Sequence, residues 1–282
     1  MYYSDLYYQT LQNLDHYSKN KDSQSSLALD IQILMEKAFG LSRDQFWIMK
    51  QNQITDRWRL RKFYRYLERL KNHEPLAYII QEKQFYTASF FVNKYVLIPR
   101  PETELIVEMA IDTLTSPARV LDIGAGSGNI SIVIALETGS TVLAIEKYKK
   151  TFQVLCRNIG SHRIREQVIP QHSDLFPKKK SKFDLIVSNP PYVSEKEWID
   201  LPPHIRNHEP KQALVSGPSG YEIIEKIISR AKEYLKPTGK LLIEIGYQQK
   251  PVVEKLLMDA DFHHIDFIND YSQIPRIACA QP

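Results

Sequence analysis

The hydrophobic positions of residues 1–72 recur with the period of an amphipathic helix. Two stripes stand out: Leu27, Ile31, Leu34, Met35 and Ala38, then Leu60, Phe63, Tyr64, Leu67 and Leu70. The stretch contains one glycine, Gly40, and no proline. We therefore expect a small all-helical N-terminal domain over residues 1–72. Its core is predicted to include the aromatic residues Tyr7, Tyr17, Phe46, Trp47 and Trp58.

The helical pattern stops at Asn72-His73-Glu74-Pro75, where a domain boundary is predicted. Shorter apolar runs follow at Phe85-Tyr86 and from Phe90 to Ile98. They predict a small β-hairpin linker over residues 73–99. A proline-rich extended segment, Pro99-Arg100-Pro101-Glu102-Thr103-Glu104, then leads into a helix and a second domain.

Strands and helices alternate from residue 118 onward. The predicted strands are residues 119–123, 141–146, 167–169, 183–188, 240–245, 262–268 and 276–280. The predicted helices are residues 129–138, 148–159, 221–235 and 251–258. This alternation is typical of a mostly parallel sheet with helices on both faces. The last connection is too short for a helical crossover, so the last strand is predicted to be antiparallel. Residues 100–282 are thus expected to form an α/β, Rossmann-like domain.

A glycine-rich turn follows the first strand of this domain, in Val120 to Asn129. Glycine lets the backbone approach a ligand closely, and the following helix start offers free N–H groups. The dinucleotide fingerprint requires glycine where this chain has Asn129, and the lysine of the phosphate loop is absent. The pattern is instead that of a site for an adenosyl amino acid. Its predicted contacts are Gly124, Ala125, Gly126, Ser127 and Gly128.

Two carboxylates lie at or just after the ends of the next strands. Glu146 lies about twenty residues after the glycine turn, where a carboxylate can accept hydrogen bonds from both ribose hydroxyls. Asp174 is predicted to accept from an adenine amino group, with Leu175 or Phe176 as an apolar wall. The carboxyl ends of parallel strands meet at one edge, so these groups are expected to form one site with Asn189.

Asn189-Pro190-Pro191-Tyr192 directly follows the strand at residues 183–188. Proline fixes φ and has no N–H, so two prolines hold the local carbonyls in nearly fixed directions. By itself the tetrapeptide is either a rigid turn or a socket for a planar group that carries an NH2. The neighbouring ligand site favours the socket. Arg100 is either a cation placed at this site or an ordinary solvated one.

The overall composition is that of a globular protein, with 43% hydrophobic and 25% charged residues in 282. The net charge of +4 is mildly basic. Basic residues gather on the last predicted N-terminal helix: Arg57, Arg59, Arg61, Lys62, Arg65, Arg69 and Lys71. They form either a solvated face or a docking surface for an acidic or RNA-bearing partner.

Nothing in the sequence indicates a membrane, a disulfide or a metal site. The apolar runs are all too short for a transmembrane helix, and the first residues lack a signal-peptide pattern. Cys156 and Cys279 are predicted to be reduced, buried thiols of a cytoplasmic protein.

These motifs together resemble the HemK/PrmC family of release factor glutamine methyltransferases, which belong to the class I methyltransferases. The resemblance covers nearly the whole chain. Beyond the glycine turn and Asn189-Pro190-Pro191-Tyr192, it includes residues 99–104, Glu209-Pro210 with Ala213-Leu214, and Glu244-Ile245-Gly246.

The resemblance implies methylation of the glutamine amide in the Gly-Gly-Gln motif of bacterial class I release factors, with S-adenosylmethionine as donor. It places Gly124 to Gly128, Glu146 and Leu175 on cofactor positions and Asn189 to Tyr192 on substrate positions. Asn189, Pro190 and Tyr192 are the predicted catalytic residues, with Arg100 as a further substrate contact. The family usually has aspartate at position 146 and an aromatic residue at position 175.

The resemblance also implies that residues 1–72 dock the release factor. The protein is then expected to be a cytoplasmic monomer that forms no stable nucleic-acid complex.

Two other functions use the same motifs. One is methylation of the adenine amino group in DNA or RNA, but such enzymes carry a target-recognition region and a basic groove. This chain has 28 residues between Tyr192 and Tyr221, without a basic cluster. The other is a non-catalytic module that binds ribosome or RNA through its basic N-terminal helix. The intact glycine turn and Asn-Pro-Pro-Tyr disfavour it.

Overall fold

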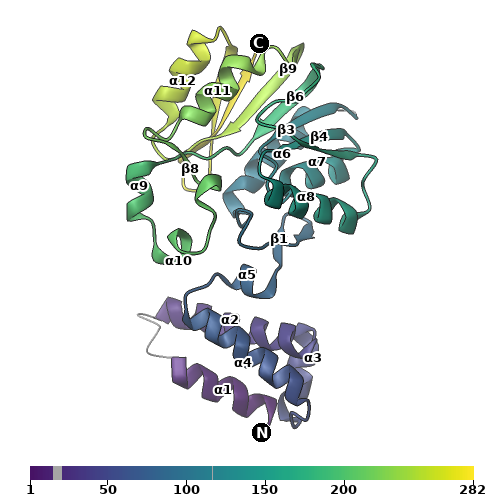
Figure 1. Ribbon diagram of the computed structural model, residues 1–282, viewed down its shortest axis with the longest axis vertical. Helices are drawn as coiled ribbons and strands as arrows, with labels where there is room; N and C mark the ends of the chain where they lie inside the picture. The colour runs from purple at the N-terminus through teal and green to yellow at the C-terminus, as the bar shows by residue number, and fades with distance from the viewer. Residues whose placement is uncertain (15–20, 116) are drawn as a thin grey trace. The chain divides into compact units, whose positions relative to one another are not determined.

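The computed structural model describes residues 1–14, 21–115 and 117–282. It divides into two compact units, Met1–Gln81 and Glu82–Pro282 (Figure 1). We call them the N-terminal and C-terminal units and describe each by itself. Tyr17, one of the predicted core residues, lies outside the described residues.

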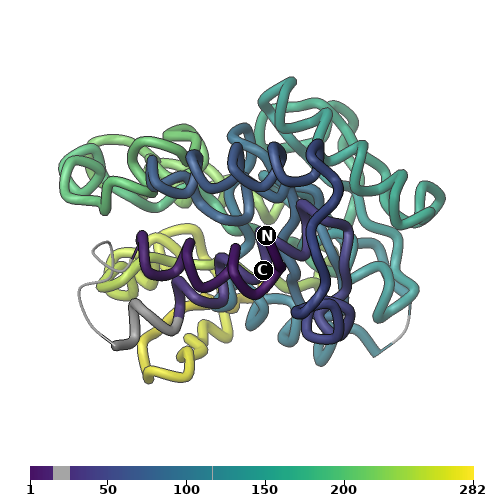
Figure 2. Tube along the Cα trace, turned by 90° about the horizontal axis from the view of Figure 1, so that it is seen from below, coloured from purple at the N-terminus to yellow at the C-terminus, as the bar shows by residue number. Residues whose placement is uncertain are grey.

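The N-terminal unit is helical, as the periodicity predicts. Its elements are α1 (Tyr3–Leu14), α2 (Lys21–Phe39), α3 (Arg43–Ile48), η2 (Met49–Gln51), α4 (Arg57–Lys71) and α5 (Leu76–Ile80). Helix α2 packs against both α1 and α4, and its course beside them can be followed in Figure 2. Asp56 caps α4 by accepting hydrogen bonds from the backbone N–H groups of Trp58 and Arg59. The predicted stripes meet in the core, where Ile31, Leu34 and Phe63 are fully buried.

Two of the predicted core aromatics lie on the surface instead. Tyr7 and Phe46 are buried, but Trp47 is 48% exposed and Trp58 is 65% exposed. Trp47 directly follows Phe46 on α3 and therefore points to a different side of the helix. Trp58 lies in the first turn of α4, off the stripe that contains Phe63 and Leu67. Both indoles are instead close to lysine ammonium groups, those of Lys50 and Lys62.

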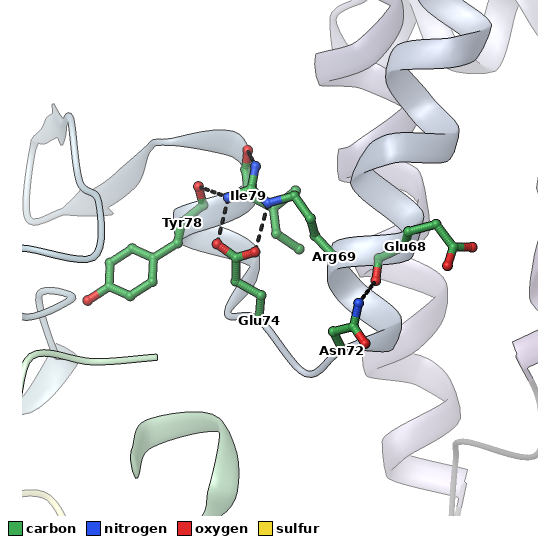
Figure 3. A network of polar contacts seen from close by, with 6 residues as sticks. All are labelled: Glu68, Arg69, Asn72, Glu74, Tyr78 and Ile79. Carbon is green, nitrogen blue, oxygen red and sulfur yellow. Dashed lines mark hydrogen bonds and ion pairs between the residues drawn. The ribbon is translucent and has the colours of Figure 1, made fainter. Parts of the chain in front are cut away.

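A polar network holds α5 to the end of α4 (Figure 3). The Arg69 guanidinium donates two hydrogen bonds to the Glu74 carboxylate, at 2.7 and 2.6 Å, and others to the carbonyl oxygens of Tyr78 and Ile79. Helix α4 does end at Lys71, as predicted. The compact unit nevertheless continues to Gln81 rather than ending at residue 72. The reason is that Arg69 reaches past the break and Ile79 is buried in the same core.

The C-terminal unit contains a seven-stranded sheet with the order β10-β11-β9-β6-β3-β4-β5. The strands are β3 (Arg119–Ile123), β4 (Thr141–Glu146), β5 (Val168–His172), β6 (Phe183–Ser188), β9 (Leu235–Glu244), β10 (His263–Asn269) and β11 (Pro275–Gln281). Strand β11 pairs antiparallel with β9 and β10, while the β3, β4, β5, β6 and β9 pairings are parallel. The predicted Rossmann-like sheet with an antiparallel last strand is confirmed.

Helices cover both faces of this sheet (Figure 1). They are α6 (Glu104–Thr113), α7 (Asn129–Thr138) and α8 (Lys149–His162) on one face, and α11 (Glu222–Ala231) and α12 (Lys250–Asp259) on the other. Apolar residues of α11 and α12 pack on alternate residues of the central strands, such as Leu121, Ile186 and Leu241. Cys279 is buried in β11, and Cys156 is half-buried; both are free thiols.

The predicted hairpin is present but shorter than expected. Strands β1 (Lys83–Phe85) and β2 (Ala88–Phe90) pair antiparallel, whereas residues 91–98 form no strand. The reason lies in Asn158 of α8, which takes the place of a strand partner. Its side-chain oxygen accepts from the Phe91 N–H at 2.9 Å, and its nitrogen donates to the carbonyl oxygens of Phe91 and Ser127. The hairpin therefore belongs to the C-terminal unit.

Short elements fill the rest of this unit. They are η3 (Pro101–Thr103), β7 (Val193–Ser194), α9 (Glu195–Asp200), α10 (Pro203–Arg206), η4 (Lys211–Ala213) and β8 (Val215–Gly217). Across the part of the chain that is described, every helix is too short or too polar to cross a lipid bilayer.

Candidate active site

The register of the sheet brings the predicted site residues to one edge. Ile123 of β3 lies beside both Ile145 of β4 and Ser188 of β6, and Ser188 lies beside Ile243 of β9. The residues that follow each of these strands therefore face a common space. A cavity of about 240 Å³ occupies it. From the predicted set, it is lined by Arg100, Gly124, Ala125, Gly126, Ser127, Glu146, Asp174, Leu175, Asn189 and Pro191.

The glycines of the turn have different structural roles. Gly124 and Gly126 have φ of +76° and +58° and line the cavity. A Cβ on Gly124 would meet no protein atom within 4 Å, so it would project into open space. Gly128 does not line the cavity. A Cβ there would lie 2.7 Å from Leu155 Cδ1 of α8, so this glycine serves the packing of α7 against α8.

Glu146 holds the glycine turn in place. Its Oε2 accepts from the Gly126 N–H at 3.1 Å and its Oε1 from the Tyr148 N–H at 2.7 Å. Burial raises the pKa of this carboxyl, and the backbone N–H groups partly offset the effect. A carboxylate has about four acceptor positions, so both oxygens can still bind a diol in the cavity.

The three predicted residues of the loop after β5, Asp174, Leu175 and Phe176, do not all lie at the cavity. Asp174 forms an ion pair with Lys147 at 2.9 Å, and both line the cavity. Leu175 adopts a left-handed backbone conformation, with φ of +57°, and also lines the cavity. Phe176 does not. It is 3% exposed and stacks on Tyr234 in the core, with ring centroids 4.7 Å apart.

The interpretation of Phe176 as a wall for adenine is therefore corrected. The left-handed turn at Leu175 leaves that side chain in the cavity and directs the next one into the core. Leu175 alone provides the apolar contact from this loop.

The Asn189-Pro190-Pro191-Tyr192 segment is fixed by contacts outside itself. Asn189 Nδ2 donates to Thr103 Oγ1 at 3.0 Å, which leaves Oδ1 as the free end of an amide that lines the cavity. Pro191 lines the cavity, whereas Pro190 and Tyr192 do not. The Tyr192 ring packs against the core, and its hydroxyl donates to Glu244 Oε1 at 3.5 Å.

Arg100 is a placed cation. It lines the cavity and forms an ion pair with Glu209, whose side chain is 1% exposed. Glu209 also accepts a hydrogen bond from the Ile98 N–H at 3.4 Å. This carboxylate therefore joins the segment before α6 to the segment between α10 and η4.

Sequence reasoning assigned no role to several groups around the cavity. Lys147 and Tyr148 line it just before α8, and Thr151 lines it from the first turn of that helix. Four further residues line it from η4 and β8: Gln212, Ala213, Val215 and Ser216. Thr103 lines it as well, and its hydroxyl oxygen accepts a hydrogen bond from Asn189. Glu244, which accepts from the Tyr192 hydroxyl, could have been placed at this sheet edge, because it lies near the end of the predicted strand at residues 240–245.

Comparison with known proteins extends these observations. A family model described as the methyltransferase small domain matches residues 102–204, and one described as the PrmC N-terminal domain matches residues 18–80. The release factor glutamine methyltransferase of Fusobacterium nucleatum is 34% identical, over 96% of this chain and 79% of its own length. That of Buchnera aphidicola from Acyrthosiphon pisum is 35% identical, over 95% and 94%.

The chain belongs to the release factor glutamine methyltransferase family. Its fold is also that of a solved 16S rRNA methyltransferase from Thermus thermophilus in complex with AdoMet and guanosine. That likeness has a TM-score of 0.51 and 17% identity, and it covers 71% of this chain and 49% of the other.

The site of this release factor glutamine methyltransferase family member fits S-adenosylmethionine, its methyl donor. The missing Cβ atoms of Gly124 and Gly126 leave room in the cavity, and Leu175 gives it an apolar wall. Glu146 supplies buried acceptors suited to a ribose, and Asp174 an acceptor suited to an amino group. The lining suits a nucleoside joined to an amino acid rather than a phosphorylated ligand. Among the described lining residues Arg100 is the one arginine, so there is no arginine cluster of the kind that binds phosphate groups.

Proposed function

We propose that this protein methylates the side-chain amide nitrogen of the glutamine in the Gly-Gly-Gln motif of bacterial class I release factors. The observation that carries the proposal is the orientation of Asn189. Its nitrogen is bound to Thr103, so an acceptor oxygen remains at a cavity that also contains the glycine turn and Glu146. The names of the relatives, which cover most of the chain, support the same substrate.

The task of the protein is orientation, because an amide nitrogen is a poor nucleophile. Asn189 Oδ1, at the cavity, accepts one N–H bond of the substrate amide, and the backbone carbonyl of Pro190, next in the chain but outside the cavity lining, accepts the other. The two prolines keep this socket rigid, since each fixes its own φ. Such placement can contribute roughly 7–11 kcal/mol to lowering a barrier in favourable cases.

S-adenosylmethionine supplies a methyl group on a positively charged sulfur; the nitrogen forms the new bond with its lone pair, and the sulfur keeps the electrons of the old one. The two acceptors stabilise the positive charge that develops on the nitrogen. The surplus proton then leaves to water, since the methylated nitrogen is strongly acidic. The sequence predicts that Tyr192 is catalytic. Its contact with Glu244 supports a role in fixing the shape of the socket instead.

The proposal extends to partners. The N-terminal unit presents exposed basic side chains on α4, among them Arg57, Arg61 and Arg65, and these suit an acidic region of the release factor. We expect a monomer that forms no stable nucleic-acid complex. The setting is the cytoplasm, where translation terminates.

Labelled S-adenosylmethionine provides the test. The protein is incubated with a release factor, with the same factor carrying glutamine-to-alanine in the Gly-Gly-Gln motif, and with DNA. Label on the first substrate alone is expected. Label on DNA would instead support an adenine methyltransferase, and no label on any substrate would support a binding module.

The Asn189→Ala variant tests the mechanism in the same assay. Turnover should be abolished, because one of the two acceptors is gone, while cofactor affinity falls only modestly. Near-normal turnover in this variant would contradict the assignment of Asn189.

A further inference from the structure

The backbone of Asn189-Pro190-Pro191-Tyr192 has few hydrogen-bonding groups of its own. Proline has no N–H, so the two central residues of the segment donate no backbone hydrogen bond. Strand β6 fixes the segment at one end, since it ends at Ser188. At the other end, the Tyr192 carbonyl is bound by a side chain from a distant part of the chain, that of Gln249. The position of the segment therefore depends in part on Gln249.

We propose that Gln249 is a positioning residue for the methyl transfer, which acts by holding the backbone of the Asn189-Pro190-Pro191-Tyr192 segment in place. The inference rests on the proposed function, because it concerns the socket that orients the substrate amide. Gln249 does not belong to the described lining of the cavity, so it acts on the substrate only through the segment that it holds.

The amide of Gln249 joins three separate parts of the chain. Its Nε2 donates to the carbonyl oxygens of Tyr192, at 2.9 Å, and Gly220, at 3.1 Å. Its Oε1 accepts from the Gly246 N–H at 2.9 Å. Tyr192 follows β6, Gly220 precedes α11, and Gly246 follows β9. Among side chains, amides alone offer two N–H donors beside an acceptor, so this set of partners requires an amide.

Two glycines make room for this contact. A Cβ on Gly220 would lie 2.9 Å from the Tyr192 carbonyl oxygen and 3.3 Å from Gln249 Nε2. A Cβ on Gly246 would lie 3.0 Å from Tyr192 Cδ2 and 3.1 Å from Gln249 Oε1. The backbone at both positions approaches more closely than a side chain there would allow without displacement. The Tyr192 end of the segment is therefore enclosed by Gln249 and both glycines.

Gln249 extends from an anchored helix. It is the N-cap residue of α12, yet its side chain makes no capping bond to that helix. Val253 and Leu257 of α12 are buried, so they fix the helix in the core. The amide of Gln249 is thus held by a rigid element and is used on the Tyr192 segment instead of on the cap.

The test compares the wild type with Gln249→Met and Gln249→Glu, using a purified release factor and labelled S-adenosylmethionine. Methionine has a similar length but no N–H donor, and an ionised glutamate would turn acceptors toward two carbonyl oxygens. Both variants should lower kcat about tenfold, the effect of losing roughly one hydrogen bond in the transition state. KM for the release factor and the Kd for S-adenosylmethionine should stay near wild type, because the residues that line the cavity are unchanged.

Gln248→Met and Gln248→Glu are the matched controls, since they make the same changes at the neighbouring, exposed residue. They should keep the wild-type kcat. Three outcomes would overturn the proposal: a wild-type kcat in either Gln249 variant, an equal loss in the matching Gln248 variant, or a loss of S-adenosylmethionine binding that parallels the loss of kcat. The last outcome would show that Gln249 supports the fold of the whole domain rather than the segment. If Gln249→Glu does not fold, Gln249→Met still decides.

A measurement independent of catalysis separates this inference from the proposed function. In ¹⁵N-labelled protein, the side-chain NH2 signals of Asn189 should shift in Gln249→Met and stay in place in Gln248→Met. Unshifted signals in Gln249→Met would refute the positioning role. If the wild type places no label on the release factor, the proposed function fails, and the NMR comparison still shows whether Gln249 holds the segment.

Discussion

At the scale of single residues, the site depends on buried polar groups that make few contacts. Asp122 in β3 is fully buried behind the glycine turn, and Ser131 donates a hydrogen bond to its Oδ2. Its Oδ1 has no partner among the described residues. Burial raises the pKa of Asp122 to about 7, against a hydrogen bond from Ser131 and with a contribution from Glu146. Such a group links the stability of the fold to pH.

Asp122→Asn should make the stability less dependent on pH. An aspartate in the unfolded chain ionises near 3.8, but Asp122 in the folded chain holds its proton up to about 7. Between these values the folded state binds the extra proton, so wild-type stability falls as the pH rises. The asparagine variant has no carboxyl group to bind this extra proton. Urea unfolding across the window should therefore give a shallower slope of free energy against pH.

Asp184→Asn provides the control for this measurement. At Asp184, burial is outweighed by hydrogen bonds from Lys236 and the Arg119 backbone, which lower the pKa. Above about pH 5, Asp184 is thus ionised in both states, and the slopes are compared there. Its replacement should shift the stability without changing the slope. An equal slope in the wild type and Asp122→Asn would show that Asp122 is not the titrating group.

The positions of some site residues could be predicted from the sequence, and those of others could not. Gly124, Glu146 and Asn189 lie at or just after the ends of strands whose hydrophobic pattern is unambiguous, so their place at one edge could be predicted. Thr103 could not be given a role, because its hydrogen bond with Asn189 joins positions 86 residues apart in the sequence. Phe176 was assigned to the cavity because adjacent apolar residues are equivalent in a sequence. The left-handed backbone at Leu175, which separates them, is set by tertiary structure.

At the scale of elements, the same distinction holds. The strands β3, β4 and β6 have the predicted bounds, because buried parallel strands are continuous apolar runs. Helix α5 was not predicted and fell within the predicted linker, because a five-residue helix is too short to show a helical hydrophobic period. What places it in the N-terminal unit is a set of hydrogen bonds from Arg69.

Arg69→Ala should release α5 from α4. The change removes a paired carboxylate contact and leaves the carbonyl oxygens of Tyr78 and Ile79 without this donor. A loss of about 1–3 kcal/mol is expected for charged hydrogen bonds that are partly shielded from water. Chemical unfolding measures the loss, and limited proteolysis should cut near residues 72–81 sooner than in the wild type.

Lys71→Ala is the matched control for Arg69→Ala. It removes an ion pair with Glu68 on the same helix, where Glu68 is 67% exposed. Exposed pairs contribute little, so stability and cleavage should stay near wild type. If both variants behave alike, Arg69 is only a surface charge and the boundary has another cause.

At the scale of the whole molecule, the two compact units carry different kinds of surface. The C-terminal unit contains every residue that lines the cavity, from Tyr95 to Ile223. The N-terminal unit contributes exposed aromatic and basic side chains, including Trp58 and Arg61. We propose that the first unit along the chain recognises the release factor, while the second contains the cavity for the methyl donor.

Charge reversal on α4 should weaken recognition without touching the chemistry. Arg61→Glu with Arg65→Glu changes two exposed residues one helical turn apart. KM for the release factor should rise, with a steeper effect at low salt, while kcat and the Kd for S-adenosylmethionine remain unchanged. Steady-state kinetics at several salt concentrations measure both.

The control for this charge reversal is Lys178→Glu with Lys179→Glu. These two lysines lie in an exposed loop of the C-terminal unit, and the pair of changes alters the net charge equally. The loop variant should keep the wild-type KM. An equal rise in KM in both variants would show a general charge effect rather than docking through α4.

The amide of Asn158 has a consequence for how this sequence can evolve. Its oxygen and its nitrogen form hydrogen bonds with backbone groups of Phe91 and Ser127, and these bonds involve neither side chain. Asn158 therefore places no demand on the side chains at positions 91 and 127, whereas position 158 itself needs an amide. An aspartate of nearly the same shape would turn an oxygen toward two carbonyl oxygens inside the protein. One buried amide thus lets the hairpin and the glycine turn vary separately and still remain joined.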